Sequence, residues 1–181
     1  MSPGGAIGTV MERIEELSTD LFAAIPSQTS EADRRWLLAV QRATARVRGG
    51  FAYLEIGSHL GGSIQPYLLD PRCRAIFSID ARPGSQPDDR APGYVAGYEH
   101  NSTDRMLRLL RDLAPDQVGK VRCFDADASE IDPAGISPRP HVAFRSASAA
   151  LEERQGIIDG ASASACTRSA IKIIATWGRL G

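Results

Sequence analysis

Between residues 50 and 144, short apolar runs alternate with helical patterns and turns, and this alternation restricts the fold more than any other feature of the chain. Short apolar runs bounded by turn signals are typical of buried strands. Strands joined through helices need right-handed crossovers, so the sequence predicts a mainly parallel sheet with helices on both faces. The expected strands are 51–56, 74–80, 120–127 and 140–144, and the expected helices between them run over about 61–69 and from Asn101 or Ser102 to just before Pro115.

Two further helices are predicted ahead of this region. Apolar residues at helical spacing indicate one over 8–25 and another over 31–48. Ser30 and Asp33 resemble a capping box at the start of the second helix, and glycines follow its end. The apolar stripe expected on the second helix consists of Trp36, Leu37, Val40 and Val47.

The 181 residues, 43% of them hydrophobic and 24% charged, predict one soluble domain of class α/β. Its expected parts are an N-terminal helical extension at 1–49, a Rossmann-like cofactor-binding half at 50–144 and an atypical C-terminal tail at 145–181. A net charge of −1 gives no general attraction for nucleic acid or an anionic membrane, so neither is an expected partner.

The cysteines and the chain's hydropathy bear on location. Cys73, Cys123 and Cys166 show no CxxC spacing, which argues against a zinc site or a disulfide framework and favours a reduced, cytoplasmic protein. No segment approaches eighteen uninterrupted apolar residues, so a membrane span is not expected.

The stretch YLEIGSHLGGS at 53–63 places Glu55 inside a predicted strand and a glycine-rich turn directly after it. In an open parallel sheet the ligand lies beyond the carboxyl ends of the strands, where glycines allow close approach. A dinucleotide fingerprint would need glycine at His59, so a nicotinamide cofactor is disfavoured. A buried carboxylate is costly without a cation or donors. The sulfonium and ammonium groups of S-adenosyl-L-methionine would meet that need.

Three motifs, LEIGSHLGGS, SIDARP and VRCFDADASEI, resemble those of the class I S-adenosylmethionine-dependent methyltransferases over roughly residues 50–144. The resemblance implies that Asp80 accepts hydrogen bonds from the ribose hydroxyls. Independently, Asp80 ends an apolar run 25 residues after Glu55, and a carboxylate can accept from two hydroxyls at once. The residues implied to surround the methionine part are Glu55, Gly57, Ser58, Gly61 and Gly62, and those implied to lie against adenine are Asp127 and Ala128.

Each motif also has a structural interpretation. The glycines could serve only as a turn, Asp80 could be a helix cap or a solvated turn residue, and DADASE could be an acidic turn with an Asx cap. In the long loop at 81–100, Tyr98 and His100 are the candidates for contact with a small-molecule acceptor, and Tyr94 could be an anchor. No second ligand stands at a plausible spacing from His59, His100 or His141, so no metal is expected, and no catalytic residue is named.

The tail departs from the family pattern. Arg145 and Ser146 stand where the fourth strand should carry an acid, and 37 residues cannot supply the missing βα units, so the C-terminal half is expected to be incomplete. One hypothesis is a reading-frame shift near Arg145; the other is a natural short form in which 171–177 adds a strand. A less favoured alignment uses Ile158-Asp159-Gly160 as the acidic motif.

These observations favour an S-adenosylmethionine-dependent methyltransferase that acts on a small-molecule acceptor by O- or N-methylation. The alternative is a truncated relative without catalysis that acts as a binding or interaction module. In that case a free edge beside the fourth strand would pair with another chain and give a homo-oligomer. A nucleotide-dependent oxidoreductase is the third and least favoured reading.

Overall fold

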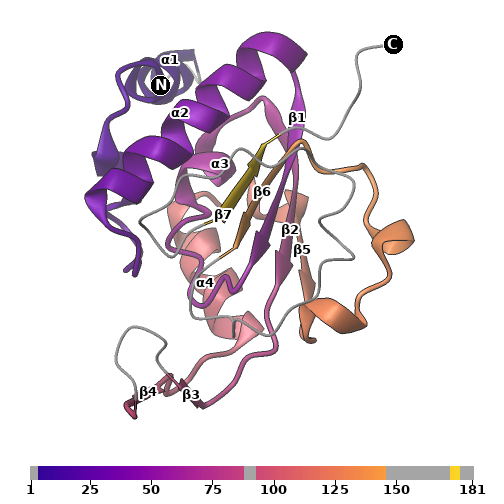
Figure 1. Ribbon diagram of the computed structural model, residues 1–181. Helices are drawn as coiled ribbons and strands as arrows, with labels where there is room; N and C mark the ends of the chain where they lie inside the picture. Colours follow the sequence, from indigo (N-terminus) through magenta and orange to yellow (C-terminus); the bar gives the residue numbers. More distant parts are fainter. Residues whose placement is uncertain (1–3, 88–92, 146–171, 176–181) are drawn as a thin grey trace.

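The computed structural model describes residues 4–87, 93–145 and 172–175, and these form an α/β fold built on one five-stranded sheet (Figure 1). Four of its strands are parallel, as the sequence predicts. The strands are β1 Phe51–Ile56, β2 Cys73–Ile79, β3 Ser85–Pro87, β4 Val95–Gly97, β5 Val121–Phe124, β6 Val142–Arg145 and β7 Lys172–Ala175. The α-helices are α1 Gly4–Glu15, α2 Glu31–Arg48, α3 Gln65–Leu69 and α4 Thr103–Leu113. The 3-10 helices are η1 Thr19–Phe22, η2 Val118–Lys120, η3 Ala128–Glu130 and η4 Pro133–Gly135.

The strand order is β5-β2-β1-β6-β7. The chain steps from β1 to β2 to β5 in one direction and then crosses back to β6 on the other side of β1. The strand order therefore reverses beside β1, where an open α/β sheet binds its ligand.

The last strand, β7, runs antiparallel to β6. It falls inside the segment 171–177 for which an extra strand was one of the two expectations. The edge of β6 that was expected to be free is therefore paired, with Phe144 opposite Ile173. Ile158-Asp159-Gly160 and Cys166 lie outside the described residues.

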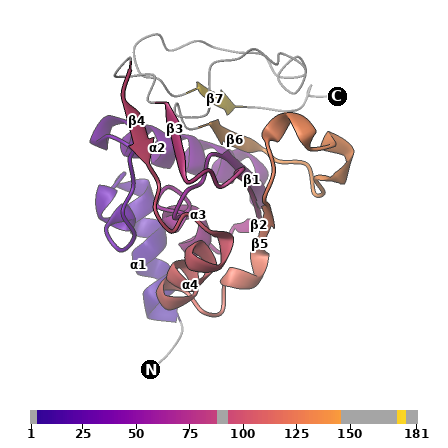
Figure 2. The ribbon, with the colours of Figure 1, turned by 90° about the horizontal axis from the view of Figure 1, so that it is seen from below.

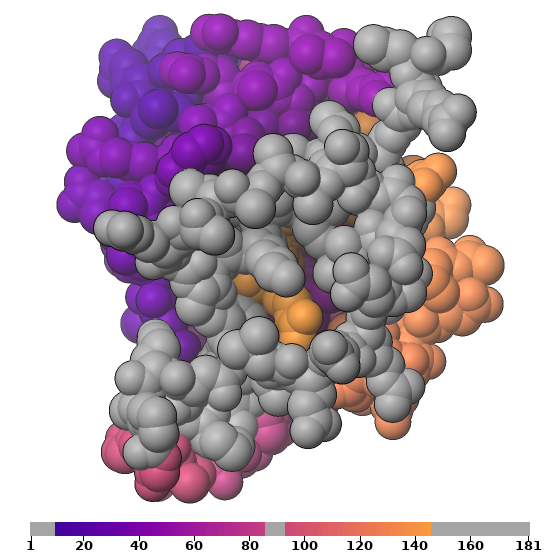
Figure 3. Space-filling view, in the orientation of Figure 1, coloured from indigo at the N-terminus to yellow at the C-terminus, as the bar shows by residue number. Residues whose placement is uncertain are grey.

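All four α-helices pack into one apolar cluster on a single face of the sheet (Figure 2). Phe51 and Tyr53 of β1 point into this cluster, whereas Ala52 and Leu54 point to the opposite face. In the described part of the chain, that second face is covered by the segment with η3 and η4. Figure 3 shows this segment, in orange, and the N-terminal helices, in indigo and purple, on separate sides of the surface.

The prediction of helices on both faces thus holds for one face of the described structure. A right-handed crossover from β5 to β6 must pass over the second face. Pro133, Pro138 and Pro140 lie in that crossover, and proline disfavours a continuous helix. The segment therefore packs through turns, with Ile131 and Ile136 against the sheet.

The predicted helix over 8–25 is wrong in length. The first helix ends at Glu15, because Leu17 adopts a left-handed conformation with φ of 56°. The chain turns there and continues into η1, which buries Leu21 and Phe22 against the core. Apolar periodicity continued through the break because both elements bury residues on the same side.

The second helix has the predicted bounds and the predicted capping box. The Ser30 hydroxyl accepts from the Asp33 N–H, and the Asp33 carboxylate accepts from the Ser30 N–H. The predicted apolar stripe is wrong in part, because Trp36 is 56% exposed and Val47 is 76% exposed. The buried side chains of α2 are Leu37, Leu38, Gln41 and Ala45.

Strand β1 has the predicted bounds, β2 is shifted by one residue, and the remaining predicted elements are shorter than expected. The helix expected over 61–69 begins only at Gln65, and Ser102 caps α4 through the Arg105 N–H. The region expected to be largely loop at 81–100 holds the antiparallel pair β3 and β4. No helix in the described residues has the length and apolar character needed to cross a membrane.

The side chain of Gln65 joins the N-terminal extension to the sheet. Its Oε1 accepts from the N–H groups of Ala24 and Ile25, at 3.0 and 2.9 Å. Its Nε2 donates to the carbonyls of Phe22, Ile25 and Gly62. Gln65 is fully buried, and its amide contacts five backbone groups, three of which share the two hydrogens of Nε2.

Replacement of Gln65 by leucine tests this junction. Gln65→Leu leaves buried N–H and C=O groups without partners, at a cost of roughly 1 to 3 kcal/mol for each group. We expect the free energy of unfolding, measured by urea denaturation with circular dichroism, to fall by at least about 3 kcal/mol. The exposed Gln117 provides the control, Gln117→Leu, which should change stability by less than about 0.5 kcal/mol. Equal stability of the two variants would contradict the role given to Gln65.

Candidate functional site

Glu55 and Asp80, the two acids predicted to bind a cofactor, lie at the carboxyl ends of neighbouring parallel strands. Glu55 is paired in register with Ser78, two residues before Asp80. Side chains alternate along a strand, so Glu55, Ser78 and Asp80 point to the same face, which is the helical one. The sheet therefore brings the two carboxyl groups together.

The carboxyl group of Glu55 is buried, at 1% exposure, and the hydrogen-bond donors that it meets among residues 4–87, 93–145 and 172–175 are neutral. The Tyr53 hydroxyl donates to its Oε2 at 3.1 Å, and the Ser63 hydroxyl donates to its Oε1. Burial raises the pKa of Glu55 to about 8, although these two donors and the more distant Arg82 oppose the rise. At neutral pH the Glu55 carboxyl group is mostly protonated, because none of the cationic groups in the described residues lies close enough to stabilise its charge.

Asp80 meets a different environment. Its Oδ2 accepts from the His59 N–H at 2.7 Å, and its Oδ1 accepts from the Arg82 N–H at 2.9 Å. The Arg82 guanidinium lies 3.6 Å away. Asp80 is therefore neither a solvated turn residue nor a helix cap, because it is buried and holds the turn after β1 against the turn after β2.

Arg82 is a site residue that sequence reasoning missed. Its side chain is only 8% exposed, and its backbone φ is 54°. Its guanidinium donates to the Ser58 hydroxyl, to the His59 carbonyl and to Asn101 Oδ1. Its buried Nε has no hydrogen-bond partner in the described residues and lies 3.7 Å from Asp125 Oδ1, with which it forms a long ion pair. The motif SIDARP contained the arginine, but arginine after a strand is usually exposed, so nothing in the sequence indicated burial.

The three glycines of the turn have conformational or packing reasons to be glycine. Gly57 has a φ of 80° and donates its N–H to the Ile79 carbonyl. A Cβ at Gly61, whose φ is 81°, would lie 3.1 Å from a side-chain atom of Met106 in α4. A Cβ at Gly62 would lie 2.3 Å from the backbone oxygen of Pro26. Gly61 and Gly62 therefore allow α4 and the N-terminal extension to pack closely on the turn.

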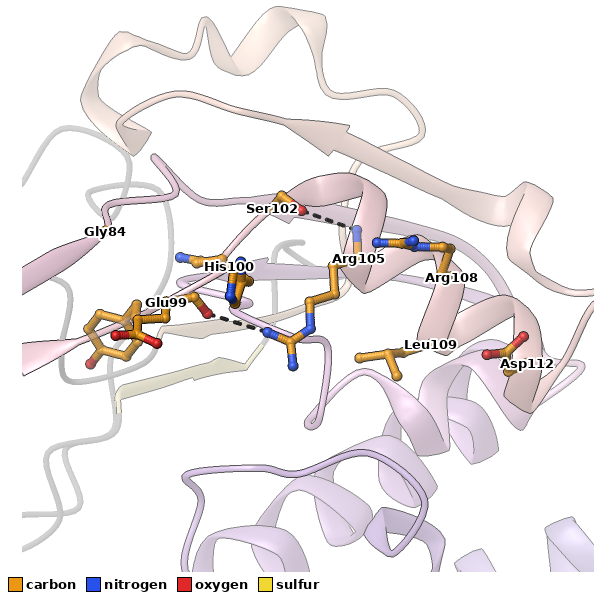
Figure 4. A pocket seen from close by; sticks show the side chains of 10 residues that line it. Gly84, Glu99, His100, Ser102, Arg105, Arg108, Leu109 and Asp112 are labelled. Carbon is orange, nitrogen blue, oxygen red and sulfur yellow. Dashed lines mark hydrogen bonds between the residues drawn. The ribbon is translucent and has the colours of Figure 1, made fainter.

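The glycine turn adjoins an open depression through His59. The His59 and Tyr98 rings meet edge to face with centroids 5.2 Å apart, and Tyr98 lines the depression together with His100 (Figure 4). Burial lowers the pKa of His59, the guanidinium groups of Arg82 and Arg105 lower it further, and Asp80 opposes them. The two residues proposed for acceptor contact thus share one depression beside the glycine turn.

Asp127 follows β5 and has a local structural role. Its Oδ1 accepts from the Ser129 N–H at 2.8 Å, so the side chain caps η3 in the way that the alternative interpretation of DADASE expects. Ala128 packs against the apolar face that is opposite to the α-helices. Glu55 and Asp80 face the helical side, so the sheet separates Ala128 from them.

The described residues contain no cluster of three or more His, Cys, Asp or Glu side chains that could hold a metal ion. Cys73 and Cys123 are free thiols. The polar side chains gathered at the carboxyl ends of β1 and β2 are Tyr53, Glu55, Ser58, Ser63, Ser78, Asp80 and Arg82.

The raised pKa of Glu55 predicts how stability depends on pH. An unfolded chain loses the Glu55 proton near pH 4.5, whereas the folded protein keeps it until about pH 8. The folded state binds more protons in this window, so the contribution of Glu55 to stability is lost as pH rises from about 4.5 to 8. A tenfold change in a protonation equilibrium is about 1.4 kcal/mol, so the decline amounts to a few kcal/mol.

Urea denaturation across this pH range checks the assignment. The variant Glu55→Gln keeps the shape of the side chain and cannot titrate, so its unfolding free energy should depend less on pH. The exposed Glu12 supplies the matched control, Glu12→Gln, which should keep the wild-type dependence. A wild-type slope in Glu55→Gln would exclude Glu55 as the titrating group.

The close packing at Gly62 gives a second prediction. Gly62→Ala forces a methyl group into the backbone at Pro26 and Ser27, so either the turn or the extension must shift. We expect a loss of roughly 1 to 3 kcal/mol in the free energy of unfolding. Gly119→Ala is the control, because a Cβ there meets nothing within 4 Å and φ is ordinary. If Gly62→Ala and Gly119→Ala change the free energy of unfolding equally, the turn can accommodate a methyl group at Gly62 and the prediction is wrong.

In comparisons with known proteins, no protein-family model, no curated protein and no solved structure matches the chain.

Proposed function

We propose that the chain is an S-adenosylmethionine-dependent methyltransferase of class I type that acts on a small-molecule acceptor. The observation that carries the proposal is that Glu55 and Asp80 point to one face at the carboxyl ends of the paired strands β1 and β2, beside the reversal of strand order. This is the position at which open parallel sheets bind nucleotides and related cofactors. The motif resemblance over residues 50–144 supports the same conclusion.

The chemistry of Glu55 fits a cationic ligand. A buried carboxyl group with only hydroxyl donors and a pKa of about 8 loses little by staying neutral and gains a strong interaction when a cation arrives. Glu55 would then release its proton and hold the positively charged amino-acid end of the cofactor. Asp80 would hold the ribose, and Gly57 and Ser58 would line the methionine part.

Arg82 sets a condition on this binding. Its guanidinium lies against Ser58 and Asp80, two of the residues proposed to hold the cofactor. Arg82 has a left-handed φ, and its Nε forms no hydrogen bond and only a long, 3.7 Å ion pair with Asp125, so holding the side chain in this buried position costs stability. The side chain would move aside on cofactor binding, and Asp80 would exchange one cation for polar hydroxyl groups.

The cofactor would supply a methyl carbon made electrophilic by its bond to a sulfonium sulfur. The protein's part is to hold the acceptor in line with that bond and to exclude water. A hydroxyl or amine acceptor also has to lose a proton. The imidazole of His59, whose pKa is lowered, is neutral at pH 7 and can accept that proton.

Isothermal titration with S-adenosylmethionine tests the proposal. Wild-type affinity should increase as pH rises toward 8, and each binding event at pH 7 should release part of a proton, seen as a difference between buffers of different ionisation enthalpy. Glu55→Gln should bind at least about tenfold more weakly and without proton release, since it lacks the carboxylate. Glu12→Gln is the control. Absence of binding heat in folded wild-type protein would reject the proposal.

The second candidate is a binding or interaction module without catalysis. The supporting observation is that the protein's own Arg82 already lies in the polar site. Under this alternative Arg82→Ala would lower stability without creating affinity for the cofactor. Under the methyltransferase proposal Arg82→Ala keeps that affinity.

A further inference from the structure

We propose that the depression between residues 98–102 and α4 is the acceptor subsite and that it selects a small molecule carrying an anionic group, a carboxylate or a phosphate. The assignment of this depression to the acceptor rests on the proposed function, but binding of an anion there does not require the cofactor. The residues that line the depression and carry the argument are Tyr98, Glu99, His100, Arg105, Arg108 and Asp112.

Two arginines on one side of α4 supply the charge. Arg105 and Arg108 are three residues apart, so they lie on the same side of the helix, and both line the depression. Among the described residues neither has a carboxylate within 4 Å, whereas Arg35, Arg46 and Arg72 each form an ion pair. In the described part of the chain, the one hydrogen bond of either guanidinium group is from Arg105 to the Glu99 carbonyl, at 3.3 Å. Both guanidinium groups therefore keep donors for a ligand.

The arrangement of charges favours an anion at the centre of the depression. Figure 4 shows the Arg105 guanidinium between the 98–102 segment and Leu109, with Glu99 and Asp112 at opposite ends. The two acids are thus separated along the depression, while the arginines lie between them. A guanidinium donates two parallel hydrogen bonds to a carboxylate or phosphate, which favours a compact anion over a single charged atom.

Two contacts connect this depression to the glycine turn. The Tyr98 ring, which forms part of its wall, packs on His59 of the turn. Asn101, also in the wall, accepts from Arg82, which contacts Ser58. A molecule anchored at Arg105 would therefore extend past Tyr98 toward His59, and the anion would fix which of its groups faces the turn.

Titration of ¹⁵N-labelled full-length protein with small anions tests the subsite. The probes are sodium benzoate, inorganic phosphate and, as the opposite charge, benzylamine hydrochloride, each at ionic strength held constant with sodium chloride. We expect saturable chemical-shift changes at 98–109 with benzoate or phosphate, and the stronger of the two identifies the source of the anion. Arg105→Gln should weaken that binding about tenfold or more, and Arg108→Gln should weaken it less, because Arg105 lies at the centre.

Arg111 of the same helix provides the matched control, because it is exposed and does not line the depression. Arg111→Gln should leave the affinity unchanged. Shifts that never saturate, equal loss in Arg111→Gln and Arg105→Gln, or preferential binding of benzylamine would each overturn the subsite. Anion binding without any binding of S-adenosylmethionine would leave the subsite intact and reject the methyltransferase proposal, and the reverse result would reject the subsite alone.

Discussion

The carboxylate of Asp80 is the interaction on which the geometry of the site depends. It accepts the backbone N–H of His59 and of Arg82, and both of these residues have left-handed φ values. Such a conformation costs roughly 1 to 3 kcal/mol for a residue other than glycine. A hydrogen bond to a charged acceptor contributes about 1.5 to 3 kcal/mol, so each bond can offset the strain of the residue that donates it. One side chain thereby fixes two turns from neighbouring strands.

The two buried acids differ because their neighbours differ. Asp80 lies beside a guanidinium and two backbone donors, whereas Glu55 has two hydroxyl groups and a pKa near 8. The environment of Glu55 keeps its carboxyl group mostly neutral at pH 7. If a cationic ligand binds at this site, Glu55 is the acid that can form a new ion pair with it. Arg82 already provides the cation for Asp80, so it does not compete directly for Glu55.

Much of the fold could be predicted from local pattern. The apolar runs located the four parallel strands, and Ser30 with Asp33 located the start of α2, because these signals depend on neighbouring residues alone. The break at Leu17 and the exposure of Trp36 could not be predicted, because tertiary packing decides which apolar residues reach the core. In the site, Glu55 and Asp80 could be identified from their places at strand ends. Arg82 could not, because its burial depends on partners in three separate segments.

The two faces of the sheet differ in a way that follows from the strand order. Steps from β1 to β2 and from β2 to β5 go in one direction, so right-handed crossovers place α3 and α4 on the same face. The connection from β5 to β6 has to cross the other face. Its prolines disfavour a continuous α-helix, so it consists of turns and the short 3-10 helices η3 and η4. Glu55, Asp80 and Arg82 point to the helical face, so α4 forms a wall for them while the crossover does not. Under the proposed function, an acceptor that reaches His59 on this side would meet the start of α4, where Arg105 and Arg108 lie.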